Sequence, residues 1–116
     1  MRNGSCGAAL LALVGVMSAS PASAGETVEV TISDLAFAPV DVTIHAGDSV
    51  KWVNKDFVAH SATAKSGGFD IFLDAGKTAV RQFGTAGKYD YFCRFHPNMV
   101  GSVTVVAKDK PSTTHP

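Results

Sequence analysis

Three side chains that can bind a metal ion follow one another at three-residue intervals near the end of the chain: Cys93, His96 and Met99. A second histidine, His60, lies well upstream. A thiolate, two imidazoles and a weak thioether form the donor set of a mononuclear copper site for electron transfer. A single turn that carries three of these donors can bring them to one ion without the ordering of a long loop. The four residues therefore predict a metal site.

Taken one at a time, these residues have ordinary structural roles. A free cysteine is among the most buried residue types, a lone histidine is more often a surface residue, and a lone methionine usually fills a core. Their combination favours the metal site. A strand that ends at Cys93 and another that begins farther on would place the donors at an end of the fold rather than in its core.

His45 competes with His60 for the upstream position in the donor set. It stands beside the turn formed by residues 46–48, and the strand alternation before it points its side chain toward solvent. His115 lies in the polar tail, where ordering the chain around an ion would cost conformational entropy. The sequence therefore favours His60.

The first 24 residues are predicted to be a cleavable signal peptide. Arg2 provides a positive start, residues 8–17 form an apolar run, and Ser20–Ala24 ends in an Ala-x-Ala cleavage site. The apolar run is shorter than the roughly 20 residues that span a bilayer, so we expect no membrane span. The alternative is a buried N-terminal helix, which Pro21 would cut short. We expect export to the periplasm or a similar extracytoplasmic compartment.

Cleavage after Ala24 would leave one small domain with a single core. We expect this domain over residues 25–107 and a flexible tail over residues 108–116. Cys6 would leave with the leader, so Cys93 would be the sole thiol in an oxidising compartment, where a metal ligand is a good explanation for it. Lys and Arg number 10 against 10 for Asp and Glu, a balance that argues against nucleic-acid binding.

The predicted mature region has the pattern of short strands. Val28, Val30 and Ile32 alternate with polar residues at a period of two. Further strand candidates, rich in β-branched and aromatic residues, are residues 42–44, 50–52, 79–83, 89–93 and 103–107. Turn clusters separate them, and no segment has a sustained helical period. This pattern predicts an all-β antiparallel sandwich, whose clustered end loops would let His60 meet the Cys93–Met99 turn.

With these motifs the chain resembles the cupredoxins, the small blue-copper proteins, and most closely their amicyanin/plastocyanin-like branch. The matching segments lie between Val28 and Val105 and are residues 37–39, 46–54, 60, 87–93 and 96–99. The Cys-x-x-His-x-x-Met spacing is the short ligand loop associated with amicyanins. The resemblance implies a Greek-key β-sandwich and one type 1 copper ion that alternates between Cu(I) and Cu(II). The implied copper ligands are His60, Cys93, His96 and Met99.

Two positions depart from the family pattern. Many relatives have Asn directly after the first histidine, where its side chain ties the two ligand loops together. This chain has Ser61 there, so the tie is expected to be shorter or to move elsewhere, for example to Asn54. The backbone N–H of Ser61 is still a candidate donor to the Cys93 sulfur. Arg94 and Phe95 are a large and charged pair for so tight a turn, which bears on the choice of partner.

We expect a mobile electron carrier rather than an enzyme, because the chain has no second histidine cluster for a substrate-reactive metal. The expected protein is a monomer that exchanges electrons with redox partners such as a dehydrogenase or a c-type cytochrome. The partner would dock at the His96 face, with an apolar docking surface drawn from Phe37, Pro39, Val58 and Phe95. One alternative is copper storage or delivery with the same ligands. The other is a metal-free sandwich that binds a partner through the same face.

Overall fold

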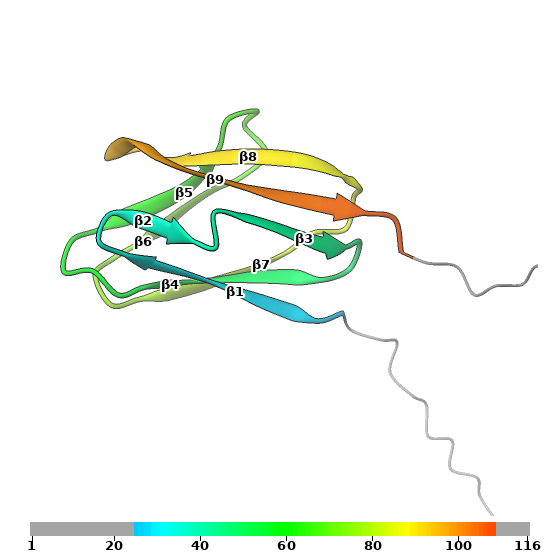
Figure 1. The fold of residues 1–116 in the computed structure, drawn as a ribbon, viewed down its shortest axis with the longest axis horizontal. Helices are drawn as coiled ribbons and strands as arrows, with labels where there is room; N and C mark the ends of the chain where they lie inside the picture. The colour runs from blue at the N-terminus through cyan, green and yellow to red at the C-terminus, as the bar shows by residue number, and fades with distance from the viewer. Residues whose placement is uncertain (1–24, 109–116) are drawn as a thin grey trace, which may run out of the picture.

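The computed structural model describes residues 25–108, which contain nine β-strands joined by turns and short loops (Figure 1). The strands are β1 Thr27–Ser33, β2 Ala36–Ala38, β3 Asp41–His45, β4 Ser49–Asn54, β5 His60–Ala64, β6 Asp70–Leu73, β7 Thr78–Gln82, β8 Gly87–Cys93 and β9 His96–Val106. Residues 25–108 include no helix long and apolar enough to cross a membrane. The predicted signal peptide and all but the first residue of the predicted tail lie outside the described residues.

The strands form two sheets, with the orders β2-β1-β4-β7 and β3-β9-β8-β5-β6. The predicted all-β sandwich is confirmed, but both sheets are mixed rather than wholly antiparallel. β1 pairs in parallel with β4, and β3 pairs in parallel with β9. The first parallel pair arises because the chain leaves β2 for β3 in the opposite sheet and then returns to lie beside β1. Such crossings between sheets replace simple hairpins and produce the sandwich.

The strands expected from alternating hydrophobicity are all present, but three are longer than expected. β4 ends two residues later, β8 begins two residues earlier and β9 begins seven residues earlier than the pattern suggested. Three strands were missed, namely β2, β5 and β6. β5 is buried at four of its five positions, so its sequence does not alternate between apolar and polar residues. β2 has three residues and β6 has four, lengths too short for a period of two to be recognised.

The core between the sheets is built around two fully buried aromatic residues, Trp52 of β4 and Tyr91 of β8. Their ring centroids lie 5.6 Å apart in an edge-to-face arrangement. Phe37 packs edge-on against Tyr91 at 4.8 Å and is only 2% exposed. The expectation that Phe37 belongs to a docking surface is therefore wrong. In the three-residue strand β2 its side chain points inward, whereas those of its two neighbours point outward.

Gly101 of β9 leaves space for the Tyr91 ring. The two residues pair across β8 and β9, and a Cβ at position 101 would lie 2.6 Å from Cζ of Tyr91. Gly101→Ala is therefore expected to lower the free energy of unfolding by about 1–3 kcal/mol through overpacking. Urea denaturation would measure this loss. Gly84→Ala is the control, because among the described residues nothing lies within 4 Å of the added Cβ. Equal losses in the two variants would contradict the explanation.

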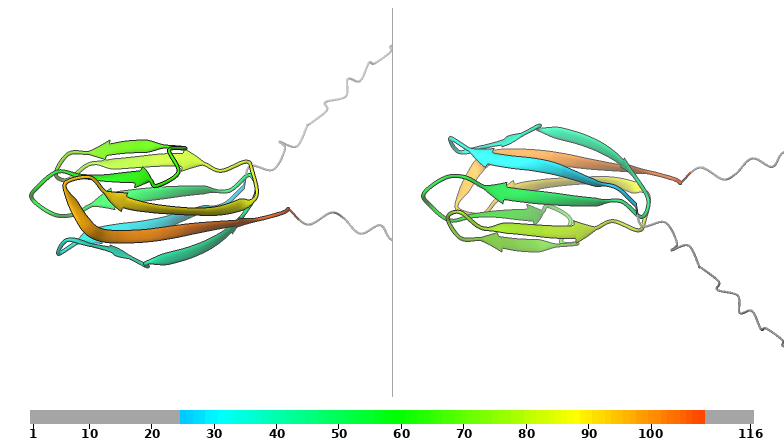
Figure 2. Two further views of the ribbon diagram at one scale, coloured as in Figure 1. Left: turned by 90° about the horizontal axis from the view of Figure 1, so that it is seen from above. Right: turned by 90° about the horizontal axis from the view of Figure 1, so that it is seen from below.

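Four connections gather at one end of the sandwich (Figure 2). They are residues 34–35, 55–59, 74–77 and 94–95. The first residue of β1 and the last of β9 lie at the opposite end (Figures 1 and 2). Side chains from residues 34–35, 55–59 and 94–95 line adjoining surface hollows. The predicted metal-binding residues lie at this same end.

Candidate metal centre

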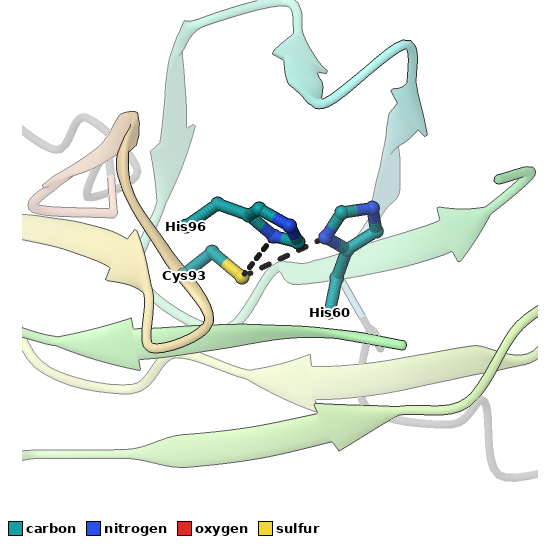
Figure 3. Close-up of side chains that lie close together, drawn as sticks. All are labelled: His60, Cys93 and His96. Carbon is teal, nitrogen blue, oxygen red and sulfur yellow. Dashed lines mark hydrogen bonds between the residues drawn. The ribbon is translucent and has the colours of Figure 1, made fainter. Parts of the chain in front are cut away.

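Three of the predicted ligands converge between the two sheets (Figure 3). His60 begins β5, Cys93 ends β8 and His96 begins β9. The Cys93 Sγ lies 3.6 Å from Nδ1 of His60 and 3.8 Å from Nδ1 of His96. All three donor atoms lie within 4.8 Å of one another. Residues 33 positions apart in the sequence are thus brought to one point by the pairing of β5 with β8.

The spacing of these donor atoms fits a transition-metal ion. First-row ions such as zinc bind nitrogen and sulfur ligands at about 2.0–2.3 Å, so ligands in a trigonal arrangement lie roughly 3.5–4 Å apart. The measured separations of 3.6 Å and 3.8 Å agree with this range. A soft thiolate combined with imidazoles is a donor set suited to copper or zinc. The arrangement can therefore hold one metal ion without a large movement of the backbone.

The turn between the ligands is shorter than the sequence suggested. β8 and β9 form a hairpin in which Cys93 pairs with His96, and a register shift falls between Phe92 and Cys93. His96 and Met99 therefore lie on β9 itself, and only residues 94–95 separate the strands. Irregularities of this kind re-aim side chains near functional sites. Met99 is 5% exposed and lines the same surface hollow as His96.

Asp56 orients the His60 ring. Its Oδ2 lies 2.8 Å from Nε2 of His60, a side chain that is fully buried. The same carboxylate accepts the backbone N–H groups of Asp34 and Leu35 at 2.7 Å and 3.0 Å. The Leu35 N–H, followed by the His60 side chain, lowers the pKa of Asp56 below its ordinary value. An ionised carboxylate only accepts hydrogen bonds, so Nε2 donates to Asp56, and Nδ1, which faces the sulfur, is the ring nitrogen available to a metal ion.

The sequence prediction missed Asp56. An acidic residue four positions before His60 was a possible signal, but only the course of the β4–β5 loop shows that the two side chains meet. A carboxylate that fixes a histidine ligand is a common device of metal sites, because it sets both the tautomer and the orientation of the ring.

Ser61 links the two ligand-bearing segments. Its backbone N–H donates to the Cys93 sulfur at 3.4 Å, which confirms the expected donor. Its Oγ accepts the backbone N–H of Arg94 at 2.8 Å, so the short hydroxyl of Ser61 itself provides the expected tie between the two ligand-bearing segments. Asn54 does not provide it. The Asn54 side chain donates instead to the carbonyl oxygens of Val58 and of two residues at the end of β6, Leu73 and Asp74.

The half-buried His96 lies in an open hollow of about 370 Å³. The hollow is lined by Leu35, Phe95, His96, Pro97, Asn98 and Met99. Val58 and Phe95 are exposed at this end, as the sequence prediction required. Phe95 lines this hollow and Val58 the adjoining one, whereas Pro39 is exposed but lines neither. The prediction missed Leu35 and the 97% exposed Phe57, because each follows an aspartate in a loop without a regular pattern.

The other two histidines are not part of this cluster of described donors. His45 ends β3, with its side chain 56% exposed and its Nδ1 3.8 Å from Oδ2 of Asp48. Its predicted surface position is confirmed. His115 lies outside the described residues. His60 is therefore the upstream histidine that the fold places beside Cys93 and His96.

Comparison with known proteins places this geometry in a family. A family model described as a cupredoxin-like domain matches residues 7–105. Amicyanin from Paracoccus versutus is 35% identical over 102 residues, which cover 79% of this chain and 77% of that protein. Its crystal structure aligns with a TM-score of 0.60 and 36% identity over 74% of this chain and 84% of that one.

Two further proteins support the comparison. The chloroplastic plastocyanin of Tetradesmus obliquus is 40% identical over 85 residues, covering 61% of this chain and 59% of that protein. A reduced Cu(I) form of an amicyanin mutant aligns with a TM-score of 0.63 and 27% identity, over 68% of this chain and 81% of that one. Sequence, fold and site geometry agree, and the chain belongs to the cupredoxin-like family.

Proposed function

We propose that this chain is a small blue-copper protein that carries single electrons between redox partners. The observation that carries the proposal is the convergence of one cysteine sulfur and two imidazole nitrogens within 4.8 Å. Thiolate and two histidines with a weak thioether are the donor set of electron-transfer copper sites. The similarity to an amicyanin form that contains Cu(I) supports copper over zinc as the metal.

In this proposal His60, Cys93 and His96 would hold one type 1 copper ion, and Met99 would supply a further, weak thioether donor. The ion, when bound, supplies a one-electron Cu(I)/Cu(II) couple. The residues around it fix the ligands for both oxidation states. Asp56 holds the His60 ring and the Ser61 N–H donates to the sulfur, which tunes the electron density on Cys93. A close-packed sandwich that does not rearrange keeps the energetic cost of electron transfer small.

We further propose that the chain is exported to the periplasm. The leader pattern of residues 1–24 supports this proposal, in which residues 25–107 form the cupredoxin domain. The protein would act as a monomeric carrier rather than an enzyme and would exchange electrons with a protein such as a dehydrogenase or a c-type cytochrome. The partner would dock on the His96 face, where apolar side chains surround a half-buried ligand.

The experiment that tests the proposed function is addition of Cu(II) to the purified mature protein, followed by visible spectroscopy and a redox titration. A strong thiolate-to-copper band and a reversible one-electron couple are the expected results. Colourless, weakly held copper would overturn the carrier function and favour storage or delivery. Failure to bind copper at all would favour a metal-free binding module.

Phe95→Asp tests whether the His96 face is the electron port, the place where electrons enter and leave the protein. Phe95 lines the hollow around His96 and is 47% exposed. A carboxylate there would place like charges opposite each other when two molecules meet, so electron self-exchange should slow roughly tenfold, about 1.4 kcal/mol in the barrier. NMR line broadening of mixed oxidised and reduced protein measures the rate. Val106→Asp introduces the same charge at the opposite end of β9 and is the control. Equal slowing in both variants would place the port elsewhere.

Leu35→Asn tests a strained turn that faces the port. Asp34 and Leu35 have φ values of 54° and 61° and form the two-residue turn between β1 and β2. A leucine is unfavourable in this left-handed conformation, but its side chain lines the hollow beside His96. Asn tolerates the conformation, so the free energy of unfolding should change by less than about 1 kcal/mol. Self-exchange should nevertheless slow several-fold. An unchanged rate would show that Leu35 has no part in docking.

A further inference from the structure

Outside the candidate ligands, four polar side chains and backbone groups form a closed hydrogen-bonded ring next to the metal centre. We call this ring the Asp70 network, and its members are Ser61, Thr63, Asp70 and Arg94. The Thr63 hydroxyl lies 2.7 Å from Oδ1 of Asp70, and the Ser61 hydroxyl lies 2.8 Å from that of Thr63. Arg94 closes the ring, because its backbone N–H donates to Ser61 Oγ at 2.8 Å and its Nε donates to Asp70 Oδ1 at 3.0 Å.

The carboxylate of Asp70 sets the direction of the two hydroxyl hydrogen bonds in this ring. The Thr63 hydroxyl, followed by the Arg94 guanidinium, lowers the pKa of Asp70 below its ordinary value, so this group is an acceptor only. The single hydroxyl proton of Thr63 therefore points to Asp70. The Ser61 hydroxyl must then donate to Thr63, which leaves the Ser61 oxygen to accept the Arg94 N–H. The ring has one consistent arrangement of protons, and both Thr63 and Arg94 donate to Asp70.

Two members of the network, Ser61 and Arg94, are next to ligands in the sequence. Thr63 of β5 pairs with Asp70 of β6 on one side and with Phe92 of β8 on the other. Ser61 directly follows the ligand His60 and donates its N–H to the Cys93 sulfur. Arg94 directly follows Cys93. A displacement of Ser61 or Arg94 would therefore change the surroundings of the sulfur and the path of the ligand turn together.

The charge of Arg94 is already matched within the chain. Its guanidinium lies over the Phe95 ring at 5.3 Å and its Nε contacts Asp70. The Arg94 and Asp70 side chains are 43% and 55% exposed, and ion pairs this exposed contribute little to global stability. The effect of the pair is therefore expected on the local geometry of the turn rather than on the stability of the fold.

We propose that Asp70 is a positioning residue for the metal centre, which holds the Cys93–His96 turn from the edge strand β6 through Thr63, Ser61 and Arg94. The proposal rests on the proposed copper-binding function. It also assigns Arg94 to the support of the turn, where the sequence alone suggested a part in partner choice. Asp70 touches no ligand, so its role is to limit the movement of the groups that do.

The first test uses the metal-free protein and measures hydrogen exchange of the Arg94 amide by NMR. Asp70→Ala should accelerate this exchange at least tenfold, because Ser61 Oγ loses its fixed orientation. Asp90→Ala is the matched control, since Asp90 is 54% exposed and pairs with Lys88 at 3.8 Å but is not a member of the network. Thr63→Val should accelerate exchange of the Arg94 amide as Asp70→Ala does. Thr63→Ser keeps the hydroxyl, so exchange should stay as slow as in the wild type. Equal exchange in the Asp70 and Asp90 variants would overturn the proposal.

The second test uses the copper-loaded protein. It measures transfer of Cu(I) from the reduced form to a chelator, and the visible spectrum of the oxidised Cu(II) form. Loss of direct partners of metal ligands typically weakens metal binding about 10–100-fold. Asp70 acts one step farther away, so Asp70→Ala should release Cu(I) about three- to tenfold faster and displace the absorption band. An unchanged release rate would overturn the positioning role. A colourless wild-type protein would instead overturn the proposed function, and the exchange of the Arg94 amide distinguishes the two failures.

Discussion

Cys93→Ser is expected to abolish the thiolate-to-copper band of the copper-loaded protein and its reversible one-electron couple. Among the described residues of the site, Cys93 alone can bind copper as a soft thiolate, and its sulfur faces Nδ1 of both His60 and His96. A serine hydroxyl in its place is a hard donor that stays protonated near neutral pH, so it cannot form the covalent metal–sulfur bond that gives such sites their colour. Visible absorption and cyclic voltammetry of the same sample measure both losses.

The control for this prediction is His45→Ala. It removes an exposed imidazole from the last residue of β3, at the end of the sandwich opposite the metal site. Its band and potential should match those of the wild type. Far-UV circular dichroism of both variants checks that the sandwich is retained. A band that survives in Cys93→Ser, or that disappears in His45→Ala, would contradict the assignment of Cys93 as the copper ligand.

The sequence predicted those parts of the fold and the site that depend on local pattern. Alternation identified the strands with one buried face, such as β1 and β4, and three-residue spacing identified Cys93, His96 and Met99 as a group. It did not identify β5, because a strand paired on both sides and buried at four of five positions shows no alternation. The parallel pairs were missed for a related reason, since pairing between distant strands has no local signature.

The supporting residues of the site were harder to predict than its ligands. Asp56 meets His60 only because the β4–β5 loop folds back, and Asp70 meets Arg94 only through the register of three adjacent strands. Neither contact follows from spacing in the sequence. The error at Phe37 has the same origin, because the inward direction of a three-residue strand is decided by its packing on Tyr91. Chemistry-bearing residues are thus readable from type and spacing, but their surroundings depend on tertiary structure.

Asn54→Leu is expected to cause the largest loss of stability among the substitutions considered. Asn54 is 1% exposed, and the two N–H bonds of its Nδ2 are shared among the carbonyl oxygens of Val58, Leu73 and Asp74 at 2.9–3.2 Å. Its Oδ1 accepts the backbone N–H of Asp56 at 3.0 Å. Leucine has a similar size but leaves all four backbone groups without this partner. An unsatisfied buried polar group costs about 1–3 kcal/mol. Only the Leu73 contact is fully buried, and the Asp74 carbonyl also accepts the Lys77 N–H, so we expect a loss of about 3 kcal/mol in the free energy of unfolding.

The same substitution should reach the metal centre, because Asn54 fixes the loop that carries Asp56, and Asp56 orients His60. In copper-loaded Asn54→Leu we therefore expect a displaced visible band as well as a lower urea midpoint. Asn98→Leu is the control for stability, since Asn98 is exposed and a change there should stay within about 0.5 kcal/mol. If Asn54→Leu lowers the midpoint but leaves the band unchanged, the loop stabilises the fold without positioning His60. If neither changes, the hydrogen bonds of Asn54 do not hold the loop.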